Sequence, residues 1–442
     1  MARGLFRRLP EVLLVTFGLA FTVAFFVTLK LHYDNLQILD KAIAVVDDGR
    51  WSHLGNATTA VGPVPGTFQT AITALPMKLW FSPYAALAGV ALFHLASLRL
   101  LALVVRDLDR KHLFLDLALL YWLNPWRVEQ SQLYNPAYLF LFSALHFWTS
   151  YRMREKSFGL TTAHVLAVGF CAQIHFSFVI LAVLSLFLWW FRYLKVHWGG
   201  FLVGVGCVAA SLIPYAVEYV QNPEVGIQAM DASGRFPGRN LLLVFPVLKA
   251  LVYWVRYGST YFARPVFSEI DFAWLAEGTP REIASAAFAA FKWPLAGLTL
   301  LLSGVANVRA FAPVWRSGPF SRAVDRTRGP AADRIPLYAF YMLLAMLVAA
   351  ALSPVQLVHW HLLLCFPVVA TLVTLGFNSL RERWPGRRIA LAFGVVLVVF
   401  AIFNTLGFLG SRAHSYQGDF HRDFMAYYES RSGTNPLPAS TP

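Results

Sequence analysis

The chain has 442 residues, of which 57% are hydrophobic and only 14% are charged. A soluble domain carries about a quarter charged residues, so this composition excludes an ordinary soluble protein and indicates a polytopic α-helical membrane protein. The formal net charge is +14, but the Lys and Arg residues lie in short segments between apolar runs, as they do in cytoplasmic loops. We therefore expect membrane lipids as neighbours and no nucleic-acid partner.

Apolar runs long enough to cross a bilayer recur along the chain, and a helix needs about 20 residues to do so. They predict an all-α fold with about 11 transmembrane helices, contained in residues 1–410. The first run follows a basic N-terminus and is too long for a cleaved signal peptide, so we expect it to remain as the first span. The expected spans lie near 12–31, 84–105, 113–126, 135–151, 158–176, 177–194, 198–217, 284–308, 335–353, 357–379 and 389–410.

Loops rich in Lys and Arg alternate with loops that are not, and the longest basic loop is 309–334. The positive-inside rule places the basic loops and the N-terminus in the cytoplasm. The extracytoplasmic side then holds a long first loop, 32–83, a second large region, 218–283, and the tail, 411–442. The tail is polar and rich in Pro and Ser at its end, so we expect it to be partly disordered.

Two apolar segments do not fit this series of spans. Residues 240–258 hold Lys249 and Arg256, and counting them as a span would move the basic loop 309–334 to the outside. We therefore expect them to form an interfacial or re-entrant helix on the outer surface. Residues 66–80 are also apolar but short and broken by Pro76, and we expect the same position for them.

Polar side chains gather at the outer ends of several expected spans, where an ionisable group beside hydrocarbon is a functional candidate. Asp34 is the foremost candidate, because it follows the first span directly and the next charged residue after it is Asp40. The other residues face the same compartment at the same depth, and we take them as candidate substrate-binding residues. They are His32, Arg127, Glu129, Gln130, Tyr134, Asn135, His175, Glu218 and His359.

A carboxylate at the depth of the lipid headgroups can take the proton of an acceptor hydroxyl as a general base. The acceptor would then displace a sugar from a lipid-linked phosphate, and the leaving phosphate would need a cation or hydrogen bonds to stabilise it. The expected outer face offers five cations for that purpose: Arg127, Arg235, Arg239, Lys249 and Arg256.

Residues 10–220 resemble the GT-C fold glycosyltransferases, near the protein O-mannosyltransferases and the lipid A aminoarabinose transferases. The shared pattern is a basic N-terminus, one span, "YDN" with Asp34, a long first loop with "GRW" and "GPVPGTFQTAITALP", and later "LNPWRVEQSQLYNPAYLF" and "QIHFSF". The acid after the first span is the proposed base in that family, so the resemblance implies that role for Asp34. It also implies that the turn from Arg127 to Asn135 shapes the donor or acceptor site. Many members have Asp-Glu where this chain has Asp34-Asn35.

The resemblance implies an inverting transferase of the bacterial inner membrane that uses a polyprenyl-phosphate sugar donor and a lipid, glycan or protein acceptor. Some members use a divalent metal, for which Asp47, Asp48, His53 and His175 are available here, and no spacing among them is diagnostic. A transporter or lipid flippase is a competing interpretation, although its polar groups would be expected near the bilayer midplane. An O-antigen-type polymerase or ligase and a non-catalytic scaffold also remain open.

Overall fold

The computed structural model describes residues 2–56, 63–222, 244–261, 267, 270–353 and 358–431, with side chains from residue 9 onward. The chain is an all-α polytopic membrane protein. Within the described residues, seven helical segments are long and apolar enough to cross a membrane. They belong to α1 (Ala2–Thr28), α4 (Pro83–Val105), α10 (Trp198–Gln221), α13 (Thr279–Arg316), α14 (Ala331–Leu352), α15 to α16 (His359–Arg383) and α17 (Gly386–Leu409).

The remaining expected spans fold as shorter helices at the places that the apolar runs predict. One of them, α8, begins with a standard cap: the Ser157 hydroxyl accepts a hydrogen bond from the backbone N–H of Leu160. The shorter helices at the remaining expected spans are α5 (Leu113–Leu117) with the π-helical turn η2 (Ala118–Trp122), η3 (Asn135–Tyr138) with α7 (Leu139–Arg152), α8 (Phe158–Ala172) and α9 (Phe178–Trp190).

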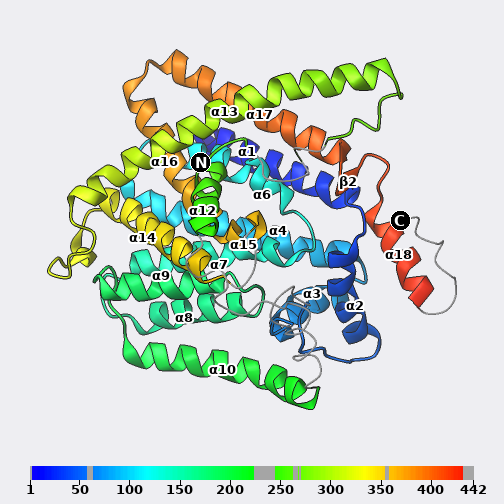
Figure 1. Ribbon diagram of the computed structural model, residues 1–442, viewed down its shortest axis with the longest axis horizontal. Helices are drawn as coiled ribbons and strands as arrows, with labels where there is room; N and C mark the ends of the chain where they lie inside the picture. The colour runs from blue at the N-terminus through cyan, green and yellow to red at the C-terminus, as the bar shows by residue number, and fades with distance from the viewer. Residues whose placement is uncertain are drawn as a thin grey trace.

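The helices pack side by side as a bundle with α7 near its centre (Figure 1). Most side chains of α7 are buried, because the helix packs against α4 on one side and α8 on another. Helix α10 packs on α8 at one edge of the bundle, and α13 and α17 lie along the opposite edge in Figure 1. Buried polar contacts also cross the interior: His146 on α7 contacts Tyr338 at 2.8 Å and Ser185 at 2.8 Å.

The segments between spans separate into two ends of the bundle (Figure 1). One end carries α2 (Tyr33–Asp47), α3 (Thr67–Leu79) and α18 (Phe420–Arg431), and we call it the α2 end. The other end carries the connections after α4, α7, α9 and α13, and we call it the basic end. Short elements complete the described chain: η1 (Arg106–Leu108), α6 (Pro125–Glu129), α12 (Val244–Tyr257), η4 (Arg326–Arg328), η5 (Leu363–Cys365), β1 (Gly410–Ser411) and β2 (His414–Ser415).

The two irregular apolar segments and the tail can now be placed. Residues 66–80 form α3, with Pro76 inside the helix. The 240–258 segment forms α12, which has 14 residues and is too short to cross a bilayer; its residues before Val244 lie outside the described residues. Of the tail, β1, β2 and α18 are formed, and Phe420 and Phe424 are fully buried. Residues 432–442 lie outside the described residues.

A buried ion pair joins α5 and α16 at the basic end. The Asp116 carboxylate has no solvent exposure, and the Arg381 guanidinium donates to both of its oxygens. The side-chain amide of Asn378 also donates to Asp116 at 2.9 Å. Because a buried carboxylate that loses its cation keeps the full cost of desolvation, this pair holds the two helices together.

Replacing Arg381 by Ala should therefore destabilise the fold by about 3–5 kcal/mol, since it leaves Asp116 buried and without its cation. Arg387→Ala is the matched control, because Arg387 is exposed and has no side-chain hydrogen bond or ion pair within the described residues. The measurement is equilibrium unfolding of both variants in detergent, followed by tryptophan fluorescence. Equal unfolding midpoints for the two variants would show that the pair does not stabilise the bundle.

Candidate functional site

Asp34 lies in the first turn of α2, a few residues after α1 ends. The next residue, Asn35, is fully buried and fixes this turn in two directions. Its side-chain oxygen accepts a hydrogen bond from the backbone N–H of His32 at 3.2 Å, and its side-chain amide donates to the backbone carbonyl of Leu133 at 2.8 Å. The start of α2 is thereby held against the turn from Arg127 to Asn135, which contains Leu133 and which we call the polar turn.

The Asp34 side chain is half-buried, and within the described residues it has no hydrogen bond or ion pair. It nevertheless faces its neighbours closely enough to act on them electrostatically. Burial lowers the pKa of His32, and the negative charge of Asp34 partly opposes that shift. Burial also raises the pKa of Tyr134, and the charges of Asp34 and Glu129 raise it further. The Asp34 charge is therefore close enough to the polar turn to act on Tyr134.

Asn135 connects three segments that are distant in sequence. Its side-chain oxygen accepts hydrogen bonds from Gln69 on α3 at 2.6 Å and from Asn56 in the first loop at 3.0 Å. Its side-chain amide donates to the backbone carbonyl of Ile174, next to His175, at 3.1 Å. The first loop, the polar turn and the corner between α8 and α9 therefore meet at one amide.

A second group of charges ties the first loop to α10. The Lys41 ammonium on α2 donates to Asn56 at 3.2 Å, and Glu218 on α10 accepts from the backbone N–H of His53 at 2.8 Å. Burial lowers the pKa of Lys41 to about 8, although the nearby carboxylates of Glu218 and Asp40 oppose the shift. Sequence reasoning selected Glu218 but missed Lys41, because nothing in its local sequence signals its burial.

The histidine that lies near His175, at the corner between α8 and α9, is His361 rather than His359. We call His175 and His361 the histidine corner. The His175 ring contacts the Ser177 hydroxyl at 2.6 Å, and that hydroxyl donates to the backbone carbonyl of His361. The rings of His175 and His361 lie 5.9 Å apart, and the charge of Lys249 on α12 acts on His361. His359 is instead buried near Trp126. The His-Trp-His spacing places the two side chains on different sides of the chain, and only the structure shows which one reaches His175.

Arg127 is fully buried, and its guanidinium reaches α1. Its guanidinium donates to the carbonyl of Trp122 at 2.7 Å, to the Thr22 hydroxyl at 2.6 Å and to the carbonyl of Gly18 at 3.3 Å. It also lies 4.0 Å from the centre of the Trp122 ring. With three acceptors and a cation–π contact, this cation joins α6 to the middle of α1, and we leave it out of the proposed site.

The next residues of the polar turn have buried polar atoms without a partner in the described residues: Glu129 Oε2, Gln130 Oε1 and Ser131 Oγ. An unsatisfied buried group costs about 1–3 kcal/mol unless water or a ligand satisfies it. Burial also raises the pKa of Glu129 to about 8, so its carboxyl holds a proton at neutral pH. It can therefore donate a hydrogen bond rather than repel a phosphate.

The described residues contain no group of three or more His, Cys, Asp or Glu side chains that could hold a metal ion. Of the ligands available in sequence, Asp48 pairs with Arg50, and His53 contacts the Thr67 hydroxyl at 3.1 Å. Divalent metal dependence stays a prediction of the sequence resemblance, and no step below is routed through a metal.

No protein-family model and no curated protein matches this chain. Among solved structures, it is similar to ArnT from Cupriavidus metallidurans in the apo state, with 13% identity and a TM-score of 0.48. It is also similar to ArnT from the same organism bound to undecaprenyl phosphate, with 14% identity and a TM-score of 0.46. Each similarity covers 88% of this chain and 62% of the ArnT chain, so this chain spans less than two thirds of the length of ArnT. ArnT is a lipid A aminoarabinose transferase with the GT-C fold, the class that the sequence resembles.

Proposed function

We propose that this protein is an integral-membrane, inverting glycosyltransferase that moves a sugar from a polyprenyl-phosphate donor to an extracytoplasmic acceptor. Asp34 is the general base in this proposal. The observation that carries it is the state of the Asp34 carboxylate. It is half-buried in the first turn of α2, close enough to the polar turn for its charge to act on Tyr134, and without a hydrogen bond or ion pair in the described residues. A carboxylate that no protein group engages is free to accept a proton from substrate.

The chemical step follows from that placement. The acceptor hydroxyl gives its proton to Asp34 while its oxygen bonds to the anomeric carbon of the donor sugar. The bond between that carbon and the phosphate oxygen breaks, and its electron pair leaves with the polyprenyl phosphate. The oxygen enters opposite the leaving group, so the anomeric configuration inverts. A positioned general base typically contributes about 10²–10⁴-fold to such a rate.

Lys249 is the cation that we propose for the leaving phosphate. Of the other cations on this side, Arg235 and Arg239 lie outside the described residues, and Arg127 points toward α1. The Arg256 guanidinium donates to the carbonyl of Tyr261 at 3.0 Å and lies over the Tyr261 ring. Within the described residues the half-buried Lys249 ammonium has no hydrogen bond or ion pair, and its charge acts on His361 of the histidine corner. A point charge of this kind stabilises a developing phosphate dianion.

The orientation is part of the proposal. The basic end carries the loops that the positive-inside rule assigns to the cytoplasm, which would place the α2 end and Asp34 outside. A reporter that is active only outside the cytoplasm, fused after Gly318 in the connection between α13 and α14, should be inactive, and the same reporter fused after Arg431 should be active. The reverse result would refute this orientation.

Asp34→Asn should reduce sugar transfer by about 10²–10⁴-fold, because the amide cannot take the acceptor proton. The measurement is transfer of labelled sugar from a panel of short-chain polyprenyl-phosphate donors into acceptors of native membranes that contain the full chain. Asp423→Asn is the matched control: it is the same change on α18, at the same end of the bundle, and Asp423 is not a candidate metal ligand. Equal turnover by the Asp34 and Asp423 variants would remove Asp34 as the base, and no transfer by the wild type from any donor would remove the proposed function.

The raised pKa of Glu129 predicts a pH-dependent stability. The folded state keeps the proton up to about pH 8, whereas an unfolded Glu loses it near its usual value, so this group's stabilisation declines as pH rises through that window. The slope reaches at most about 1.4 kcal/mol per pH unit. The depressed pKa of Lys41 acts only above about pH 8, and the depressed pKa of His32 only below its usual value. Between pH 6.5 and 8, Glu129 is therefore the one of these three groups whose shifted pKa changes the stability with pH.

Thermal unfolding in detergent across that interval should show the wild type losing stability relative to Glu129→Gln, whose amide has no proton to lose. Gln is the matched replacement because it keeps the length and the polar atoms of the side chain. Parallel pH profiles for the two proteins would show that Glu129 is ionised at neutral pH.

A further inference from the structure

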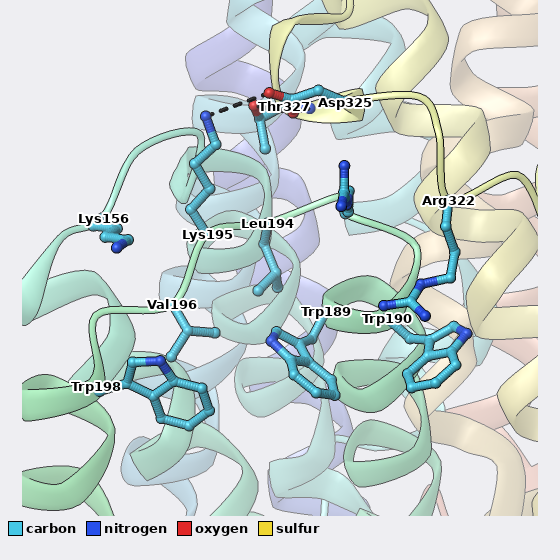
Figure 2. Close-up of a pocket in the computed structure, with 11 residues that line it drawn as sticks. Lys156, Trp189, Trp190, Leu194, Lys195, Val196, Trp198, Arg322, Asp325 and Thr327 are labelled. Carbon is cyan, nitrogen blue, oxygen red and sulfur yellow. Dashed lines mark hydrogen bonds and ion pairs between the residues drawn. The ribbon is translucent and has the colours of Figure 1, made fainter.

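A cavity of about 430 Å³ lies at the basic end, where the segments after α7, α9 and α13 meet (Figure 2). Four cations line it: Lys156, Arg192, Lys195 and Arg322. We call this cavity the basic pocket. It lies at the end of the bundle opposite Asp34, because Trp198 in its wall begins α10 and Glu218 near the candidate site lies toward the end of that helix. Twenty residues of helix correspond to roughly 30 Å.

The basic pocket has a surplus of positive charge. Its one acid, Asp325, is already engaged: it accepts from the Thr327 hydroxyl at 2.6 Å and from the Thr327 backbone N–H at 3.1 Å, and it pairs with Lys195 at 3.5 Å. The hydrogen bonds from Thr327 hold the pKa of Asp325 below its usual value, so it stays ionised. Four cations against one carboxylate leave three positive charges. Within the described residues, Lys156, Arg192 and Arg322 have no side-chain hydrogen bond or ion pair.

Three tryptophans in its wall place the basic pocket at the membrane surface. Trp189 and Trp190 end α9, Trp198 begins α10, and their side chains are 43%, 44% and 58% exposed (Figure 2). Because α10 is long and apolar enough to cross a membrane, its first residue lies where hydrocarbon gives way to headgroups. Trp is enriched at that depth. A ligand of this pocket therefore approaches from the headgroup layer.

The wall of the basic pocket is anchored to the core of the bundle. Arg192 has a backbone φ of 55°, in the left-handed region that non-glycine residues rarely adopt. Backbone hydrogen bonds before and after Arg192 hold this conformation: Phe191 N–H donates to the Phe187 carbonyl at 2.9 Å, and Tyr193 N–H donates to the Leu188 carbonyl at 2.8 Å. Lys195 N–H donates to the Met153 carbonyl at 2.9 Å. Arg322 is aligned by stacking 4.0 Å from the centre of the Trp190 ring. Cations held in advance bind an anion with less loss of conformational entropy.

We propose that the basic pocket binds the phosphate headgroup of an anionic membrane lipid, at a site separate from the candidate active site. Arg and Lys are the side chains that recognise phosphate, and the surplus of three charges favours a headgroup with more than one negative charge. The tryptophans supply the apolar surface for the glycerol and upper acyl region of the lipid. A lipid held there would join α9 to the connection between α13 and α14.

Native mass spectrometry of the full chain in detergent tests the proposal with four probes: phosphatidic acid, phosphatidylglycerol, phosphatidylcholine and inorganic phosphate. The wild type should bind phosphatidic acid at least tenfold more tightly than phosphatidylcholine, with phosphatidylglycerol between them. Lys156→Gln combined with Arg322→Gln should weaken phosphatidic acid binding by about tenfold or more, since each cation near a lipid surface contributes about 1 kcal/mol. Neither side chain has a hydrogen bond in the described residues, so the fold should persist.

Arg387→Gln combined with Arg388→Gln is the matched control, because both are exposed and lie at the same end outside the pocket. Equal affinity of the pocket variant and this control for phosphatidic acid would overturn the proposal. Inorganic phosphate bound as tightly as phosphatidic acid would assign the pocket to a soluble anion and overturn the lipid assignment. Arg322→Lys keeps the charge without the planar group, and an intermediate affinity supports the role of the stacked guanidinium.

Discussion

Polar groups at the ends of membrane helices must be satisfied within the protein, because lipid offers no hydrogen bonds. Two asparagines meet this constraint at the α2 end. Asn35 donates to the carbonyl of Leu133, and Asn135 donates to the carbonyl of Ile174 while it accepts from Gln69. Each bond joins segments that the sequence separates widely, so together they fix the relative positions of α2, α3 and the corner after α8. The position of Asp34 follows from that of Asn35.

The same constraint explains why an amide rather than a carboxylate follows Asp34. An ionised carboxylate only accepts hydrogen bonds, whereas an amide also donates. A Glu in place of Asn35 would leave the Leu133 carbonyl without its donor and would add a buried negative charge beside Asp34. The amide instead keeps Asp34 as the one acid of this turn, and it gives that acid a fixed support.

Charged side chains differ in whether they have an ion-pair partner. At the basic end, acids neutralise selected cations: Asp116 pairs with Arg381, and Asp107 lies 3.6 Å from Arg152. These pairs hold helices together. The half-buried Asp34 at the α2 end lacks such a partner within the described residues, and so does the half-buried Lys249 of α12. A charge with its partner supplied stabilises a fold, and a charge without one can act on a substrate.

The sequence could predict the parts of this structure that depend on apolar length. Each expected span coincides with a helix, and α3 and α12 lie at the two segments that were too short or too charged to count as spans. The sequence also pointed to the first loop, the polar turn and the corner after α8, which hydrogen bonds of Asn35 and Asn135 join. Side-chain direction was not: Arg127 turns toward α1 because Thr22 and Gly18 offer acceptors there, and those lie more than a hundred residues earlier. Long-range partners of this kind leave no local pattern.

A first-turn acid such as Asp34 could also serve only the helix, since a negative charge there typically contributes about 0.3–1 kcal/mol. Helix α2 does not depend on that contribution. Its inner face buries Leu39 and Ile43 without exposure, and each such side chain contributes about 1.5–3 kcal/mol. Asn35 supplies the hydrogen bonds at the same terminus. The dipole term is thus small beside the forces that already hold α2, and it does not account for a half-buried acid that has no hydrogen bond or ion pair in the described residues. The general-base role that we propose would account for a carboxylate left without a partner there.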